Sequence, residues 1–255
     1  MTGNTGWKMN KSALPSPPLN WLVFGAGAIG TYLGGSLHLH GQRITFLEQP
    51  SAADEIKQQG LSLLLSTGLK QYIAAPCIVS SLEQAFQYGP FDVAIFALKS
   101  FDTASAIEKI APSAQNMPPV ICFQNGVENE AILMSVLGEE RVIAGTVTSA
   151  VSRRATGDIV LERSRGIGLS SPHPLAKSLS NAFREAGVTT HLYAHPADMK
   201  WSKMLTNLVG NATSAILDLP PAQVFAHPLL YDLEIRQLRE TLKVMHAHGI
   251  RVVNL

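Results

Sequence analysis

Three polar residues near the end of the chain recur every four positions: Lys203, Asn207 and Asn211. On one continuous helix over residues 198–217 they would share a face, which Ser214 continues. Asparagine is a poor helix former, so this is an unusual composition for a face that only contacts solvent. Amides beside a lysine suit the binding of a polar small molecule. An ordinary polar helix face is the alternative interpretation.

A glycine-rich segment early in the chain carries a second kind of chemistry. It reads Gly25-Ala26-Gly27-Ala28-Ile29-Gly30 and follows the apolar run 21–24. The first glycine permits a tight turn, the second lets the backbone approach a pyrophosphate, and the third lets a helix pack closely on a strand. The N-terminus of the following helix offers free N–H groups to phosphates. These six residues therefore predict a dinucleotide site.

Glu48 ends the next predicted strand, at 43–47, and bears on the choice of cofactor. A carboxylate in this position accepts hydrogen bonds from the adenosine ribose hydroxyls, which favours NAD, and it would repel the 2′-phosphate of NADP. The alternative is that Glu48 faces solvent and contacts no cofactor.

Two further polar residues, Lys99 and Asn125, follow apolar strands. Ligands of open α/β sheets bind beyond the carboxyl ends of the strands. Both side chains are therefore expected near the glycine loop, although each alone has a simpler interpretation, a surface lysine and an Asn-Gly turn.

The elements that must position these residues follow a repeating pattern along the chain. We expect strands at 21–24, 43–47, 61–65, 71–79, 91–98, 119–123 and 188–193, β-rich segments at 142–151, 158–162 and 166–169, and helices at 28–40, 53–59, 102–110, 127–137, 175–186, 198–217 and 228–249. Alternating strands and helices followed by helices alone predict an α/β fold, a Rossmann-type doubly wound parallel sheet followed by a smaller all-α domain. The expected division is a flexible tail at 1–19, a dinucleotide-binding domain at 20–195 and a helical substrate domain at 196–255.

Composition narrows the class of protein. The 255 residues are 46% hydrophobic and 15% charged, with a net charge of +1, which argues against a nucleic-acid surface. Cys77 and Cys122 have no CxxC neighbour, so neither a disulfide nor a metal site is expected. The N-terminal segment lacks the apolar core of a signal peptide, and no run is long enough to span a membrane, so a cytoplasmic location is expected.

Taken together, the motifs resemble the ketopantoate reductase (2-dehydropantoate 2-reductase) family. The matching pieces are the glycine loop, Ala97-Leu98-Lys99, Gln124-Asn125-Gly126, and the run from Trp201 to Asn207 with Asn211. The match extends from about residue 20 to 250.

This resemblance implies reduction of a 2-keto acid by NADPH or NADH, most specifically 2-dehydropantoate to pantoate in pantothenate biosynthesis. It implies that Lys203 is the general acid, a role that suits an ammonium group. Asn207 and Asn211 would hold the substrate, and Asn125 would contact both substrate and nicotinamide ribose. Lys99 would contact the cofactor, as would Ala150 in the β-rich segment 142–151.

The sequence also departs from the family. Glu48 stands where members that use NADPH usually carry arginine. The family's helical domain continues beyond the length of this chain and supplies a serine and a glutamate for which no counterpart is found, while Pro220-Pro221 occupies the region of a further family asparagine. The helical domain therefore looks truncated, and its apolar helix at 228–249 would need a cover, for which a homodimer is one candidate. Two other functions stay open: a non-catalytic dinucleotide-binding protein, and an NADH-dependent reductase of another branched 2-keto acid.

Overall fold

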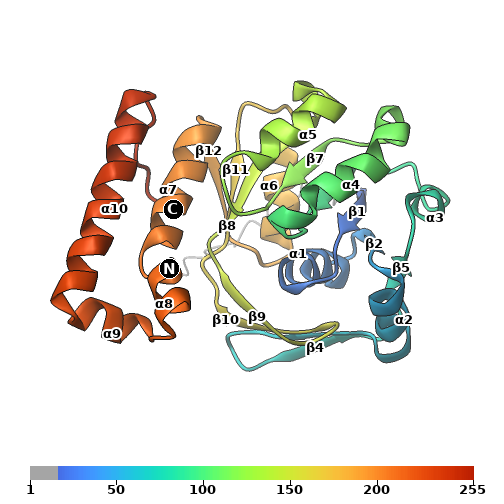
Figure 1. Ribbon diagram of the computed structural model, residues 1–255. Helices are drawn as coiled ribbons and strands as arrows, with labels where there is room; N and C mark the ends of the chain where they lie inside the picture. The colour runs from blue at the N-terminus through green and yellow to red at the C-terminus, as the bar shows by residue number, and fades with distance from the viewer. Residues whose placement is uncertain (1–16) are drawn as a thin grey trace, which may run out of the picture.

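From Asn20 to Tyr193 strands and helices alternate, apart from two runs of successive strands at 61–79 and 142–170 (Figure 1). This computed structural model describes residues 17–255. Most of the predicted tail at 1–19 therefore lies outside the described residues.

The larger of two sheets has eight strands. They are β1 (Asn20–Phe24), β2 (Arg43–Leu47), β5 (Cys77–Val79), β6 (Val93–Phe96), β7 (Val120–Cys122), β8 (Val142–Val147), β11 (Ile167–Ser170) and β12 (Thr190–Tyr193). Their spatial order is β12-β11-β8-β7-β6-β1-β2-β5. Neighbouring strands are parallel except for β8 and β11, which are antiparallel. The predicted Rossmann-type α/β fold is confirmed.

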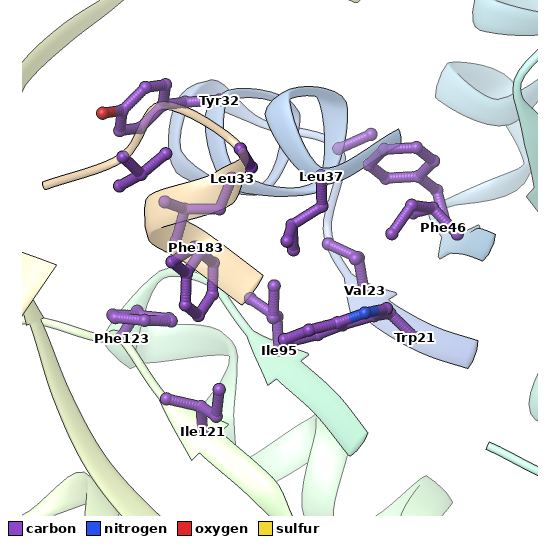
Figure 2. Packing of buried hydrophobic residues seen from close by; sticks show 14 of the residues in the cluster. Trp21, Val23, Tyr32, Leu33, Leu37, Phe46, Ile95, Ile121, Phe123 and Phe183 are labelled. Carbon is purple, nitrogen blue, oxygen red and sulfur yellow. The ribbon is translucent and has the colours of Figure 1, made fainter. Parts of the chain in front are cut away.

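Both faces of this sheet are buried, which explains why its central strands are apolar throughout. On one face, Trp21 and Val23 pack with α1 (Ala28–Leu39) and α6 (Ala176–Glu185). Figure 2 shows this side, where Leu33 of α1 and Phe183 of α6 lie over the strands. On the other face, Leu22 and its neighbours pack with α3 (Leu82–Phe86), α4 (Thr103–Ile110) and α5 (Asn129–Leu137). The remaining helix of this part, α2 (Pro50–Gln59), and three 3₁₀ turns, η1 (Ser100–Asp102), η2 (Ala111–Asn116) and η3 (Glu139–Arg141), lie in the connections.

A second, four-stranded sheet lies on the outer side of α1 (Figure 1). It is built from β3 (Leu61–Leu64), β4 (Lys70–Ile73), β9 (Ala150–Ala155) and β10 (Asp158–Arg163), in the order β4-β3-β10-β9. The expected single strand at 71–79 is wrong, because β4 and β5 belong to different sheets. The segment Ala74–Pro76 between them carries the chain from one sheet to the other.

The chain after Tyr193 folds into four helices, α7 (Pro196–Leu208), α8 (Asn211–Leu217), α9 (Pro221–Ala226) and α10 (Pro228–Ala247). The long α10 runs beside α7 (Figure 1). Several apolar side chains of α10 are exposed, Leu229 at 75% and Leu233 at 53%. A homodimer through this face stays a prediction, as does the domain boundary near residue 195. None of the helices within residues 17–255 is long and apolar enough to cross a membrane.

The expected continuous helix over 198–217 is wrong. The first helix, α7, ends at Leu208, and a second helix, α8, begins at Asn211. Gly210 has a φ of 76°, in the left-handed region that an α-helix cannot continue through. Lys203 and Asn207 therefore share a face of α7, whereas Asn211 is the first residue of α8 and does not continue that face.

Candidate functional site

The glycine loop has the geometry that its sequence predicts. Gly25 has a φ of 88°, and its N–H donates to the carbonyl of Leu47 at 2.9 Å. A Cβ on Gly30 would lie 1.8 Å from the Gly25 carbonyl oxygen, so only glycine permits this approach of helix to strand. A Cβ on Gly27 would have no neighbour within 4 Å, so the backbone there faces open space.

These features fit a dinucleotide. Gly27 is the N-cap residue of α1, a twelve-residue helix with no acidic side chain in its first turn and no side-chain cap. Its first amides are therefore available, and the positive end of the helix favours phosphate. The open backbone at Gly27 leaves room for a pyrophosphate to approach.

Glu48 contacts the glycine loop directly. Its carboxylate accepts the N–H of Ala26 at 2.9 Å and the N–H of Gln49 at 2.7 Å. The side chain is thus held at the end of β2, against the loop, rather than directed freely into solvent. A negative charge is fixed beside the predicted adenosine end of the cofactor site.

Lys99 and Asn125 lie at the same sheet edge as the glycine loop. The Ala97 N–H donates to the Phe24 carbonyl at 3.1 Å, and the Phe123 N–H donates to the Phe96 carbonyl at 3.0 Å, so the ends of β1, β6 and β7 are adjacent. Both predicted site side chains are exposed at this edge.

A polar network that the sequence pattern did not predict joins the segments that follow β6 and β7. The amide of Gln124, which is buried, donates to the carbonyls of Leu98 and Lys99, at 3.2 Å each, and to the Thr103 hydroxyl at 2.8 Å. The amide of Asn129 donates to the Asn125 carbonyl at 2.8 Å. The backbone of Asn125 is therefore fixed, while the residue itself is exposed.

Lys200 joins α7 to this edge. Its ammonium, 6% exposed, lies 2.8 Å from the Glu130 carboxylate, and it donates to the carbonyls of Gln124 at 2.6 Å and Gly145 at 3.2 Å. The charge of the lysine is thereby paired with a carboxylate, and its ammonium donates two hydrogen bonds to backbone carbonyls. One turn later the same helix carries Lys203, so Lys200 sets the position of Lys203 relative to Asn125.

Cys122 lies beside this ion pair and is chemically inert. Burial, reinforced by the negative charge of Glu130, raises the pKa of its thiol to about 12. The thiol stays protonated at neutral pH and is no nucleophile.

Lys203 is half-buried and has a perturbed pKa. Burial, and after it the nearby Arg165 cation, hold the pKa of Lys203 below its ordinary value. A lysine that gives up its proton more readily is better suited to proton transfer near neutral pH. Lys203 lines a cavity of about 260 Å³ together with Arg165 and residues of the segment 252–255.

The other predicted substrate residues are less close to this cavity. Asn207 is half-buried on α7, and Asn211 is exposed at the start of α8. Neither is among the described residues that line the cavity beside Lys203.

The break between α7 and α8 is held by Glu234 of α10. This buried carboxylate, 1% exposed, accepts the N–H of Gly210 at 2.8 Å and the hydroxyl of Thr213. A negative charge at the start of α8 also complements the helix dipole. Nothing in the sequence pattern indicated this contact, because Glu234 occupies a position that reads as one more polar residue of an amphipathic helix.

Ala150 is the first residue of β9 and is exposed. The preceding residue, Ser149, is buried, and its hydroxyl lies 3.5 Å from that of Tyr32 on α1. The start of β9 is thus placed beside the helix that follows the glycine loop, which is compatible with the predicted contact of Ala150 with the cofactor.

Comparison with known proteins identifies the family. The model described as "Ketopantoate reductase PanE/ApbA" matches residues 21–173, and the model of the C-terminal part of the same proteins matches residues 197–254. The chain belongs to the ketopantoate reductase family. It is therefore an oxidoreductase of the 2-dehydropantoate 2-reductase type, a keto acid reductase that uses a nicotinamide dinucleotide.

Individual relatives are distant but match over most of the chain. A 2-dehydropantoate 2-reductase of Pyrococcus horikoshii is 26% identical over 90% of this chain and 74% of its own length. The crystal structure of a 2-dehydropantoate 2-reductase from Geobacter metallireducens is 25% identical, covers 93% of this chain and 78% of its own, and superposes with a TM-score of 0.83. A complex of D-mandelate dehydrogenase with NADH, 20% identical, shares the fold with a TM-score of 0.79 over 92% of this chain and 75% of its own.

Proposed function

We propose that this chain reduces 2-dehydropantoate to pantoate, with Lys203 as the general acid. The observation that carries the proposal is the placement of Lys203. It is half-buried with a lowered pKa, on a helix that Lys200 fastens to the carbonyl next to Asn125. That carbonyl lies at the sheet edge where the glycine loop offers a dinucleotide site.

Reduction of the keto group to a hydroxyl group needs one hydride and one proton. The hydride comes from the reduced nicotinamide when it is bound. The Lys203 ammonium first donates a hydrogen bond to the keto oxygen, which stabilises the negative charge that develops there, and then transfers a proton to it. The product is a 2-hydroxy acid, and Lys203 recovers its proton from solvent.

The asparagines supply orientation in this proposal. Asn207 lies one turn after Lys203 on the same face of α7, and its amide holds a part of the substrate outside the cavity that Lys203 lines. Asn211 starts α8, after the break at Gly210, and holds the substrate as well. Asn125 contacts both the substrate and the nicotinamide ribose, and Lys99 and Ala150 contact the cofactor.

For the cofactor we propose NADH in preference to NADPH. The Glu48 carboxylate is fixed against the glycine loop by two backbone N–H groups. Placed there, it accepts hydrogen bonds from ribose hydroxyls and repels a 2′-phosphate.

A steady-state comparison tests the function. Oxidation of NADH and of NADPH is followed with 2-dehydropantoate, for the wild type, Lys203→Ala, and the surface control Lys177→Ala. We expect wild-type and control turnover to agree, and kcat of Lys203→Ala to fall by roughly 10²- to 10⁴-fold. Equal activity of all three proteins would refute the role of Lys203.

Glu48 also favours a second candidate, an NADH-dependent reductase of another branched 2-keto acid. In that case the same assay shows turnover with a different 2-keto acid and a kcat/KM for 2-dehydropantoate that is much lower. A non-catalytic dinucleotide-binding protein would bind NADH and reduce no keto acid at all.

A further inference from the structure

The cavity beside Lys203 is lined by a second cation. Its walls come from α7, from the connection between β8 and β9, from the segment between β10 and β11, and from the end of the described chain. The lining residues are Thr148, Arg165, Ser202, Lys203, Leu205, Thr206 and Val252 to Leu255. At about 260 Å³, the space is suited to a small organic molecule.

The backbone that carries Arg165 is held in place by Ser149. The Ser149 hydroxyl accepts the N–H of Arg165 at 3.1 Å and that of Gly166 at 2.8 Å. The Gly166 carbonyl in turn accepts the N–H groups of Thr148 and Ser149, at 3.0 and 3.2 Å. Arg165 therefore extends from a fixed point and not from a loosely held loop.

Glycine is required immediately after Arg165. Gly166 has a φ of 98°, and a Cβ there would lie 2.1 Å from the Thr189 carbonyl oxygen. The chain turns sharply at this point, directly before β11, and the exposed Arg165 is among the residues that line the cavity.

Two positively charged side chains line the same cavity. Within residues 17–255, neither Lys203 nor Arg165 forms an ion pair. No Asp or Glu side chain is among the described residues that line the cavity. Arg165 is near enough to Lys203 to lower the pKa of its ammonium. Two like charges held in one small cavity are stabilised by an anion between them.

We propose that Arg165 binds the carboxylate of the 2-keto acid substrate while Lys203 faces its keto oxygen. The inference rests on the proposed function and adds a residue that recognises the acid group. The guanidinium presents two parallel N–H donors, which match the two oxygens of a carboxylate. The carboxylate and the keto oxygen of a 2-keto acid stand on adjacent carbons, so neighbouring cations meet both groups at once.

The test compares Arg165→Met and Arg165→Lys with a control, Arg163→Met. Arg163 is an exposed residue at the end of β10 that does not line the cavity. The substrates are 2-dehydropantoate and its neutral lactone, which keeps the keto group and lacks the carboxylate. The dissociation constant of NADH is measured alongside, as is the binding of 2-dehydropantoate to the complex with NAD⁺ by calorimetry.

The proposal predicts a KM for the acid that rises about 10-fold or more in Arg165→Met, with partial recovery in Arg165→Lys. The KM for the lactone, the NADH dissociation constant, and every constant of Arg163→Met change by less than about 2-fold. An unchanged KM for the acid overturns the proposal. A weakened affinity for NADH without a change in KM also overturns it, because Arg165 would then bind a cofactor phosphate.

The calorimetric arm separates this inference from the proposed function. If the wild type binds 2-dehydropantoate but does not reduce it, the proposed function fails. The inference then stands only if Arg165→Met weakens that binding by a similar factor. A wild type that neither binds nor reduces any 2-keto acid refutes both.

Discussion

At the scale of single residues, Lys203 is set apart by its surroundings rather than by its type. It is half-buried and shares a cavity with Arg165, and both conditions lower the pKa of its ammonium. Burial and the neighbouring cation destabilise the protonated form of this lysine, so it transfers its proton to a substrate more readily.

The pH profile of keto acid reduction follows from this perturbation. Reduction needs the protonated lysine, so kcat/KM has its maximum below the pKa of Lys203 and falls as the pH rises through that pKa. We expect the midpoint of this alkaline limb below the ordinary lysine value of about 10.4. In Arg165→Met the midpoint should move to higher pH, because a neighbouring positive charge has been removed. A limb that stays in place in that variant would contradict the coupling of the two cations.

Glu48 gives a second prediction at this scale. Glu48→Gln keeps an oxygen that can accept the Ala26 N–H and removes the negative charge. We expect the ratio of kcat/KM for NADPH to that for NADH to rise by about 10-fold, since repulsion of the 2′-phosphate is lost. Glu55→Gln, on the exposed side of α2, serves as control. A ratio unchanged from the wild type would show that Glu48 does not select the cofactor.

At the scale of elements, the buried pair of Lys200 and Glu130 fastens α7 to the Rossmann-type sheet. Removing one partner leaves an unpaired buried charge, which typically costs about 3–5 kcal/mol. We expect Lys200→Met and Glu130→Leu each to lower the free energy of unfolding in urea by about this amount. The double variant should recover much of the loss. If both single variants are as stable as the wild type, the pair does not hold these elements together.

Glu234 has a comparable role within the helical part. Glu234→Leu leaves the buried Gly210 N–H without an acceptor, a loss of about 1–3 kcal/mol. Because the start of α8 carries Asn211, we also expect a raised KM for the keto acid. Urea unfolding and steady-state kinetics measure the two effects. Thr213→Val, which removes only the hydroxyl contact, should show a smaller change in both, and the reverse order would argue against this account.

The elements also show why part of the structure could be predicted and part could not. The glycine loop and its strand–helix context are local, so the sequence alone predicts the tight turn at Gly25, the open backbone at Gly27 and the close packing at Gly30. The division of residues 71–79 between two sheets depends on distant pairings. β4 pairs with β3, which also pairs with β10, whereas β5 pairs with β2. The break at Gly210 depends on a carboxylate of α10.

The same distinction holds for the site. Lys99, Asn125 and Lys203 could be proposed because they stand in recognisable motifs. Arg165, Lys200 and Glu234 could not, because their significance lies in contacts with distant segments, and in the sequence they read as ordinary charged residues. The contacts of Lys200 with Gln124 and Gly145, for example, span 76 and 55 positions.

At the scale of the whole molecule, the chain spans about three quarters of the length of the relatives it matches. Within that span the Rossmann-type sheet, the glycine loop and the helix that carries Lys203 are all in place. The central claim is therefore that the chain moves a hydride from a nicotinamide to a keto carbon, with Lys203 supplying the proton.

Isotope transfer tests this claim most directly. NADH carrying deuterium at the transferable position of C4 is incubated with the protein and 2-dehydropantoate, and the hydroxy acid is analysed by mass spectrometry. The account predicts product with one deuterium on C2 from the wild type, and product formation at least about 100-fold slower from Lys203→Ala. Hydroxy acid without deuterium, no hydroxy acid at all, or equal rates for the two proteins would contradict it.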